Sequence, residues 1–219
     1  MNQIQDYIHR DYKAISCKED LASVQDFFEE MGFSHFPVVD DLQFVGSLNA
    51  DDATTFDAAK SVADYRYILE QFYVKNSMSW FEVFEVATKN QATIIPVLDE
   101  QNQYVGYYEL EDILLFFQDT PLIKDAGSIL VINKSIQDYS LAQISQIVES
   151  NNGKILGLFI SGSADATIEI TIKLALGPLN EIIQTFRRYN YEIVSQHQED
   201  QYITNLKERS DYLDKYLNI

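Results

Sequence analysis

The first half of the chain repeats itself at a spacing of 59 residues, and this repeat limits the folds that the half can adopt. The six residues from His35 to Asp40 align with those from Ile94 to Asp99, and both runs are mostly apolar, with a proline at the third position and an aspartate at the sixth. After one inserted residue in a polar turn, the spacing becomes 60. The equivalent pairs include Leu21 and Trp80, Val24 and Val83, Phe27 and Val86, Gly46 and Gly106, and Asp52 and Asp112. Two copies of one structural unit are therefore expected to pack together.

Each copy predicts the same order of elements. Amphipathic helices are expected at Leu21–Met31 and Trp80–Lys89, and each is followed by a short buried strand that starts at a proline. A proline is tolerated at the first position of a strand because its N–H is not needed there. Acidic and amide residues then predict a turn. A second strand leads into a closing helix, expected at residues 50–59 and 109–118.

These repeats resemble the CBS domain family, named for cystathionine β-synthase. The resemblance rests on the two proline-containing runs together with the recurring glycine and aspartate. These are Phe36-Pro37-Val38-Val39-Asp40 with Gly46 and Asp52, and Ile95-Pro96-Val97-Leu98-Asp99 with Gly106 and Asp112. The resemblance covers residues 1–120. It implies that β-α-β-β-α repeats at residues 1–60 and 61–125 pair into one two-fold unit.

The same resemblance implies a nucleotide site in the cleft between the repeats, where an aspartate accepts hydrogen bonds from the ribose. The residues implied are Lys13, Ile15, Ser16, His35, Pro37, Asn49, Asp52, Pro96 and Asp112. The family has Thr or Ser where this chain has Asn49 and Glu109. A carboxylate at Glu109 would repel a phosphate, so the resemblance favours the first site over the second. Asp52 and Asp112 have another interpretation, because an aspartate at the start of a helix also stabilises its free N–H groups.

The second half predicts a different order, β-α-β-β-α-β, over residues 126–198. Strict alternation of apolar residues from Thr167 to Leu176 marks one strand, and Asn152-Gly153 predicts the end of a helix. Other strands are expected at residues 128–133, 155–161 and 191–196, with a turn at 162–166 and a helix opened by Gly177-Pro178. This order is the ferredoxin-like arrangement. Residues 199–219 predict a C-terminal helix.

After a CBS pair, this half resembles an ACT domain, and the whole chain resembles CBS-ACT proteins of the acetoin-utilisation type. The expected fold class is therefore α+β, with a CBS pair followed by a ferredoxin-like, ACT-like domain and a helical tail. ACT domains often bind amino acids at a loop after the first strand, which implies Asp138, Tyr139, Ser140 and Leu141 here. This loop lacks the Pro-Gly of the family. Arg187 and Arg188 could attract an anion, but cations at a helix end also stabilise its dipole.

Charge and composition exclude several classes of function. The formal net charge is −18, with 8 basic and 23 acidic side chains in residues 1–125 against 8 and 11 in residues 126–219. Such acidity disfavours nucleic acid and anionic membranes, and no apolar run is long enough to span a bilayer. The single cysteine, Cys17, is expected in the core of a cytoplasmic protein. The three histidines, His9, His35 and His197, lie far apart, so neither catalysis nor a metal site is expected.

Two functions fit these features. The first is a regulatory protein without catalytic activity, whose CBS pair binds AMP, ADP, ATP, NAD or S-adenosylmethionine as a regulatory ligand and needs no cofactor. The second is a CBS-ACT scaffold that mediates oligomerisation and protein interaction without a nucleotide. Both imply a homodimer, and the sequence does not identify the protein that would be regulated.

Overall fold

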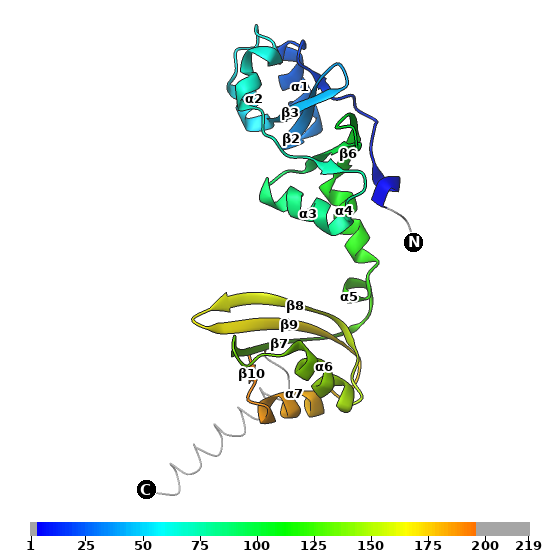
Figure 1. Cartoon of the computed structure of the whole chain (residues 1–219), viewed down its shortest axis with the longest axis vertical. Coiled ribbons are helices and arrows are strands. Elements are labelled where there is room, and N and C mark those ends of the chain that lie inside the picture. The colour runs from blue at the N-terminus through cyan, green and yellow to red at the C-terminus, as the bar shows by residue number, and fades with distance from the viewer. Residues whose placement is uncertain (1–3, 196–219) are drawn as a thin grey trace, which may run out of the picture. The chain divides into compact units, whose positions relative to one another are not determined.

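The computed structural model describes residues 4–195, and the contacts divide the chain into two units after Gln118 (Figure 1). No helix among the described residues combines the length and the apolar character that a membrane span requires. The first unit contains η1 (Ile4–Tyr7), β1 (Ile15–Ser16), α1 (Leu21–Met31), β2 (His35–Asp40), β3 (Gln43–Asn49), α2 (Ala50–Thr55), η2 (Val62–Ile68), β4 (Val74–Lys75), α3 (Trp80–Lys89), β5 (Ile94–Leu98), β6 (Tyr104–Glu109) and α4 (Leu110–Gln118).

The first unit consists of two β-α-β-β-α repeats, as the sequence predicts. Each repeat forms a three-stranded sheet, ordered β1-β2-β3 in one and β4-β5-β6 in the other. In both sheets the first pair of strands is parallel and the second is antiparallel. The register shifts at equivalent points, between Val38 and Val39 and between Val97 and Leu98. The repeat in the sequence is therefore a repeat in three dimensions, down to its irregularities.

The prediction that each buried strand starts at its proline is wrong. β2 begins at His35 and β5 at Ile94, two residues earlier in both cases. Because the N–H of Cys17 donates to the carbonyl of Val39, the backbone of Val39, and by alternation that of Pro37, faces β1. The pairing of β1 starts only at Ile15 opposite Val38. The missing N–H of Pro37 therefore removes no ladder bond, and β2 can extend past it.

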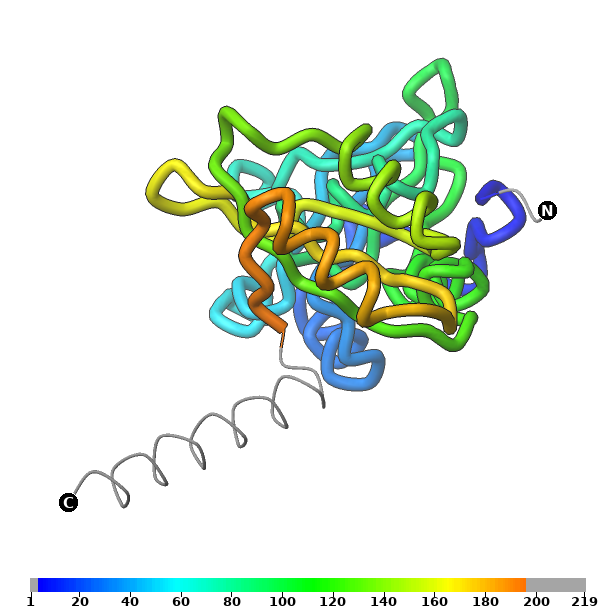
Figure 2. The backbone as a smooth tube through the Cα atoms, turned by 90° about the horizontal axis from the view of Figure 1, so that it is seen from below, coloured from blue at the N-terminus to red at the C-terminus, as the bar shows by residue number. Residues whose placement is uncertain are grey.

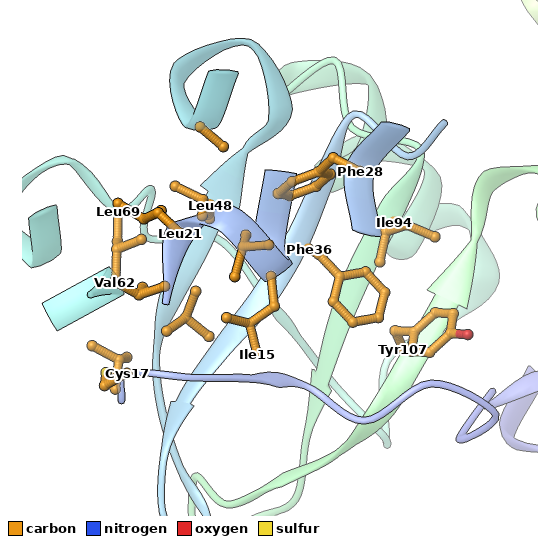
Figure 3. Close-up of a cluster of buried hydrophobic side chains, with 14 residues drawn as sticks. Ile15, Cys17, Leu21, Phe28, Phe36, Leu48, Val62, Leu69, Ile94 and Tyr107 are labelled. Atoms are coloured by element: carbon orange, nitrogen blue, oxygen red, sulfur yellow. The ribbon is translucent and has the colours of Figure 1, made fainter. Parts of the chain in front are cut away.

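The two repeats meet in a shared core and along a pseudo-two-fold axis. Ile94 and Tyr107 of the second repeat pack into the core of the first, beside the ring of Phe36 (Figure 3). At one end of the seam, Ser34 lies against its equivalent, Thr93, with the two hydroxyl oxygens 3.1 Å apart. At the other end, Gln43 pairs with its equivalent, Gln103. Equivalent residues can touch each other only next to a two-fold axis, so these contacts mark its position.

The chain segment before each repeat packs on a β-strand of the other repeat. His9 forms a reciprocal antiparallel bridge with Tyr107 of β6, and Glu70 forms one with Ser47 of β3. Each bridge lies next to a glycine with a positive φ, 151° at Gly46 and 149° at Gly106. A Cβ atom at Gly46 would lie 2.7 Å from Leu69, and one at Gly106 would overlap the backbone of His9. The recurring glycines are therefore required for the close approach of these segments.

The predicted helix limits hold for α1 and α3, and α4 differs from its predicted range only by starting at Leu110 instead of Glu109. Asp20 caps α1, and Ser79 forms a capping box with Glu82 at α3. α2 ends at Thr55, not at residue 59, because Phe56 is extended and stacks on Tyr65 with ring centroids 4.0 Å apart. Cys17 is buried in the first core, as expected.

The second unit has the β-α-β-β-α-β order that the sequence predicts. It contains α5 (Pro121–Lys124), β7 (Gly127–Ser135), α6 (Leu141–Ser150), β8 (Ile155–Ala164), β9 (Thr167–Ala175), α7 (Leu179–Arg188) and β10 (Glu192–Ile193). The four strands form an antiparallel sheet in the order β10-β7-β9-β8, which is ferredoxin-like. The two long helices, α6 and α7, cover the same face of the sheet, and the tip of the β8–β9 hairpin extends beyond them (Figure 2).

Three details of the second unit differ from the prediction. β8 continues to Ala164 through bulges, because the chain turns at Asp165 and Ala166, which both have positive φ. Leu176 lies beyond the end of β9 and is 77% exposed, so it does not join the apolar face of that strand. β10 spans only Glu192 and Ile193. The predicted C-terminal helix at 199–219 lies outside the described residues.

Candidate functional site

The residues implied as a nucleotide site fall into separate places. Lys13 and Ser16 line an open pocket, and Ile15 is buried beside it in β1. His35 and Asn49 belong to a buried polar cluster, Asp112 bonds to His9, and Asp52 lies exposed on α2. The two prolines, Pro37 and Pro96, are buried within β2 and β5. The structure therefore does not join these residues into one cleft.

The open pocket has a volume of about 530 Å³ and lies where the chain enters the first repeat. One wall is the segment before β1, which contributes Arg10, Tyr12 and Lys13. The facing walls are the turn between β1 and α1, the turn after β2 and the start of β6, which contribute Ser16, Glu19, Asp41, Leu42 and Tyr104. We call this the cationic pocket, because Arg10 and Lys13 are two of only seven lysines and arginines in residues 4–118.

Local contacts fix the walls of the cationic pocket. Arg10 donates a hydrogen bond from Nε to the carbonyl of Val105 at 2.9 Å, and the ring of Tyr12 packs edge-on against Phe27 and Phe33. Burial raises the pKa of Tyr104, and the neighbouring Arg10 offsets part of this rise. The hydroxyl of Tyr104 is buried and makes no hydrogen bond within residues 4–195. The pocket therefore combines two cations and two aromatic rings.

Two carboxyl groups limit the negative charge that the cationic pocket can accept. Glu19 and Asp41 are part of its wall. Burial raises the pKa of Glu19, and a hydrogen bond from the backbone of Ser16 to its carboxyl group offsets part of this rise. A ligand with several negative charges would meet these groups as well as the cations. The arrangement fits a compound with one or two negative charges better than a polyphosphate.

The polar side chains of the buried cluster in the first repeat bond to one another and to the start of α2. Asn49 caps α2 by accepting from the N–H of Asp51 at 2.8 Å, and its amide nitrogen lies 3.1 Å from Nε2 of His35. His35 is only 3% exposed, and its ring also lies near Ser34 and Glu70, at 2.9 and 3.3 Å. The amide oxygen and the amide nitrogen of Asn49 are therefore both in use, and a ligand could bind there only by replacing these bonds.

The aspartate of the second repeat is also engaged. Nε2 of His9 lies 2.5 Å from a carboxylate oxygen of Asp112, and the His9 ring stacks on Tyr107 with centroids 5.6 Å apart. Burial lowers the pKa of His9, but hydrogen bonds to Asp112 and Asp11 outweigh this effect, so the pKa is raised. Beside Asp112, Ile4 and Tyr7 leave a cavity of only about 10 Å³. The N-terminal segment thus covers this aspartate.

The equivalent aspartate of the first repeat is not covered in this way. Asp52 is exposed, and its carboxylate makes no hydrogen bond within the described part of the chain. It lies in the first turn of α2, where a negative charge interacts favourably with the helix dipole. Glu109, at the position where the family has a hydroxyl, lines a separate pocket of about 300 Å³ with Glu111 and Thr93. Two acids there disfavour a phosphate.

Sequence reasoning missed four residues that shape these sites: His9, Arg10, Tyr12 and Tyr104. The scarcity of cations near Lys13 could have pointed to Arg10. No pattern in the sequence indicated His9 or Tyr104, because their roles depend on a contact between the start of the chain and β6, about 98 residues apart.

The loop implied as an amino-acid site has structural roles. Ser140 caps α6 by accepting from the N–H of Gln143, and Tyr139 packs against the core of the second unit. The N–H of Asp138 donates to Ser135, and Leu141 begins the helix with 47% of its surface exposed. Arg187 and Arg188 lie in the last turn of α7, where cations favour the helix dipole.

No family model and no curated protein matches the chain. Among solved structures, it is similar to a CBS domain pair/ACT domain protein from Thermotoga maritima, with 19% identity and a TM-score of 0.48 over 53% of this chain and 96% of that one. It is also similar to CBSX2 in complex with AMP, with 14% identity and a TM-score of 0.44 over 52% and 95%. A third is the CBS domain of a bacterial CNNM/CorC family Mg²⁺ transporter in complex with ATP, with 19% identity and a TM-score of 0.42 over 51% and 84%.

The fold itself is defined by the topology described above. Two β-α-β-β-α repeats share the same strand pairing, the same bulge and a pseudo-two-fold axis. Residues 4–118 therefore have the fold of a tandem CBS domain pair, and residues 119–195 have a ferredoxin-like fold.

Proposed function

We propose that the chain is a regulatory protein without catalytic activity, whose CBS pair binds an adenosine-containing compound in the cationic pocket. The observation that carries this proposal is the pocket of about 530 Å³ lined by Arg10, Lys13 and Tyr104. Its volume falls within the range of small-molecule sites, and its lining combines apolar surface with a few polar groups. Lys13 and Ser16 are also two of the residues to which the CBS resemblance gives a role in binding.

The chemistry of the pocket indicates how such a compound would be held. The two cations would bind a phosphate or carboxylate, and a guanidinium can do so through two parallel hydrogen bonds. A purine would pack against the ring of Tyr12 or Tyr104. Because Glu19 and Asp41 also face the pocket, we expect AMP or S-adenosylmethionine to bind more tightly than ATP.

A thermal-shift panel of AMP, ADP, ATP, NAD and S-adenosylmethionine tests this function. AMP and ATP come first, because two of the similar CBS structures hold them. A ligand present at 100 times its Kd adds about 2.7 kcal/mol to the free energy of unfolding, which should raise Tm by several degrees. Lys13→Ala should weaken binding about tenfold, as expected for loss of a charge-assisted contact. Lys18→Ala is the matched control, since Lys18 is exposed and does not line the pocket.

A specific observation favours a second function, that of a scaffold without a nucleotide. Asn49 is bonded to His35, and Asp112 is bonded to His9, so two of the residues implied for binding already have partners. If none of the five compounds raises Tm, the scaffold is the better description. Amino acids form a second panel, because an ACT-like domain would bind them near Asp138–Leu141.

We further propose that the protein acts in the cytoplasm as a homodimer that regulates a partner protein. The argument for a dimer comes from β8, an outer strand of ten residues that pairs only with β9 within residues 4–195. An unpaired outer strand can add a strand from a second copy. Phe159 and Ile160 of this strand are both 49% exposed.

A further inference from the structure

The segment of residues 4–13 contributes both to the cationic pocket and to the cover of Asp112. We call it the N-terminal segment. Arg10 and Lys13 belong to the pocket, whereas Ile4, Tyr7 and His9 lie on the second repeat. The pocket therefore lacks both of its cations unless this segment is in place. Any contact that positions the segment also builds the pocket.

Several hydrogen bonds fix the N-terminal segment to the second repeat. The backbone of His9 exchanges two hydrogen bonds with Tyr107, at 2.8 and 3.1 Å. Arg10 donates to Val105, and Gln5 donates to the carbonyl of Asn76. The contact of His9 with Asp112, at 2.5 Å, is the shortest among these and the only one between two ionisable side chains. Its loss would leave this set without a bond between two side chains.

The pseudo-two-fold axis provides an internal comparison. The segment around Glu70 bridges to Ser47 as His9 bridges to Tyr107. In the first repeat, however, Glu70 reaches His35 and not the aspartate, so Asp52 remains exposed. Equivalent aspartates, each in the first turn of a closing helix, thus differ in one respect. Only Asp112 is bonded to the segment that crosses its repeat.

We propose that the contact between His9 and Asp112 positions the N-terminal segment, so that docking of this segment and ligand binding in the cationic pocket stabilise each other. The proposal deepens the function proposed above and rests on it for the ligand. His9 and Asp112 are positioning residues, because neither lines the pocket. A ligand that binds Arg10 and Lys13 favours the docked segment. By linkage, the factor by which docking raises the affinity for the ligand is the factor by which the ligand raises the docking equilibrium constant, so a change that releases the segment lowers the affinity.

Hydrogen exchange without ligand tests the first half of the proposal. The backbone N–H groups of His9 and Tyr107 each donate to the carbonyl of the other residue. Asp112→Asn should increase the exchange rate of these two amides at least about fivefold relative to the wild type. Asp52→Asn is the matched control, because it removes the equivalent charge from the equivalent helix turn without touching the segment. Equal exchange in the two variants at these amides would overturn the positioning role.

Binding of AMP tests the second half. His9→Phe keeps a ring against Tyr107 but removes the bond to Asp112, and it should weaken AMP at least about fivefold. In the wild type, AMP should slow exchange over residues 4–13. Unchanged AMP affinity in His9→Phe would overturn the coupling. If the wild type binds none of the panel, the proposed function and the coupling both fail, whereas the exchange comparison still decides whether Asp112 positions the segment.

Discussion

Ser34 and Thr93 occupy the same position in the two repeats, and each donates its backbone N–H to the hydroxyl of the other, at 3.0 and 2.8 Å. Their hydroxyl oxygens lie 3.1 Å apart, which adds a third bond. These three bonds form a small, symmetric polar set at one end of the seam between the repeats. It fixes how the two repeats are aligned, because a shift of either strand would break all three bonds.

Replacing one residue of this pair should cost nearly as much as replacing both. Thr93→Val removes a hydroxyl that both accepts from Ser34 and bonds to its side chain, so the free energy of unfolding should fall by about 1 kcal/mol. Ser34→Ala should cost a similar amount. In a double-mutant cycle measured by urea denaturation, the two losses should not add. Thr88→Val is the control, because Thr88 bonds only within its own helix. Additive losses would contradict a shared network.

Gly106→Ala should destabilise the first unit by about 1–3 kcal/mol, as expected for a strained backbone position. Its φ of 149° is unfavourable for a side chain, and a Cβ would overlap the backbone of His9. The control is Gly162→Ala, where the nearest atom to a Cβ lies at an ordinary 3.6 Å. Chemical denaturation measures both. Equal losses would mean that the approach of residues 8–10 to β6 is not required for stability.

The stability of the first unit should depend on pH through His9. Its pKa in the folded protein is raised above the ordinary 6.5, so its charged form stabilises the fold. This contribution is present in full below pH 6.5 and is lost as the pH rises through the folded pKa. The charged groups that face the ring are Asp112, Asp11 and Glu109. The gap in stability between wild type and His9→Phe, measured by urea denaturation over a pH series, should therefore shrink as the pH rises. A gap that grows would refute this assignment.

Asp52→Ala distinguishes binding in the cationic pocket from binding at the aspartate that the family resemblance implies. If the ligand binds beside Arg10 and Lys13, this substitution should leave the affinity for AMP unchanged, because Asp52 lies exposed on α2 and does not line the pocket. Isothermal titration of AMP into Asp52→Ala and Lys13→Ala compares the two. If only Asp52→Ala loses affinity for AMP, the ligand binds next to Asp52, as the family resemblance implies.

Phe159→Lys should convert the proposed dimer into a monomer. A charge on an outer strand opposes pairing with a second copy. Phe159 is half exposed on β8, so the fold of one chain should tolerate the change. Light scattering after size-exclusion chromatography measures the mass. A wild-type monomer, or a variant that remains dimeric, would exclude this edge as the interface.

The repeated architecture could be predicted from the sequence because local patterns and their spacing determine it. Helices α1 and α3 match their predicted limits, since Asp20 and Ser79 supply N-caps directly before the apolar stripes. The predicted starts of β2 and β5, at Pro37 and Pro96, are two residues too late. Whether a proline interrupts a strand depends on where the neighbouring strand begins, and that pairing is not visible locally.

The candidate site was less predictable, because it depends on contacts between distant parts of the chain. Lys13 and Ser16 were named from the resemblance, but Tyr104 and Arg10 join them only through the packing of the N-terminal segment on β6. The same packing engages Asp112 with His9, which the spacing of the histidines did not suggest. A pattern can indicate which residue types are available, whereas the fold decides which of them remain accessible.

The packing of the N-terminal segment on the second repeat has a consequence for the order in which the protein folds during synthesis. His9 leaves the ribosome 103 residues before Asp112, its partner on the second repeat. Since synthesis proceeds at roughly 5–20 residues per second, the first β-sheet can assemble while these opening residues still lack a surface to dock on. They should be the last part of the pair to settle, because a nascent chain arrested before β6 lacks Tyr107, with which the backbone of His9 exchanges two hydrogen bonds.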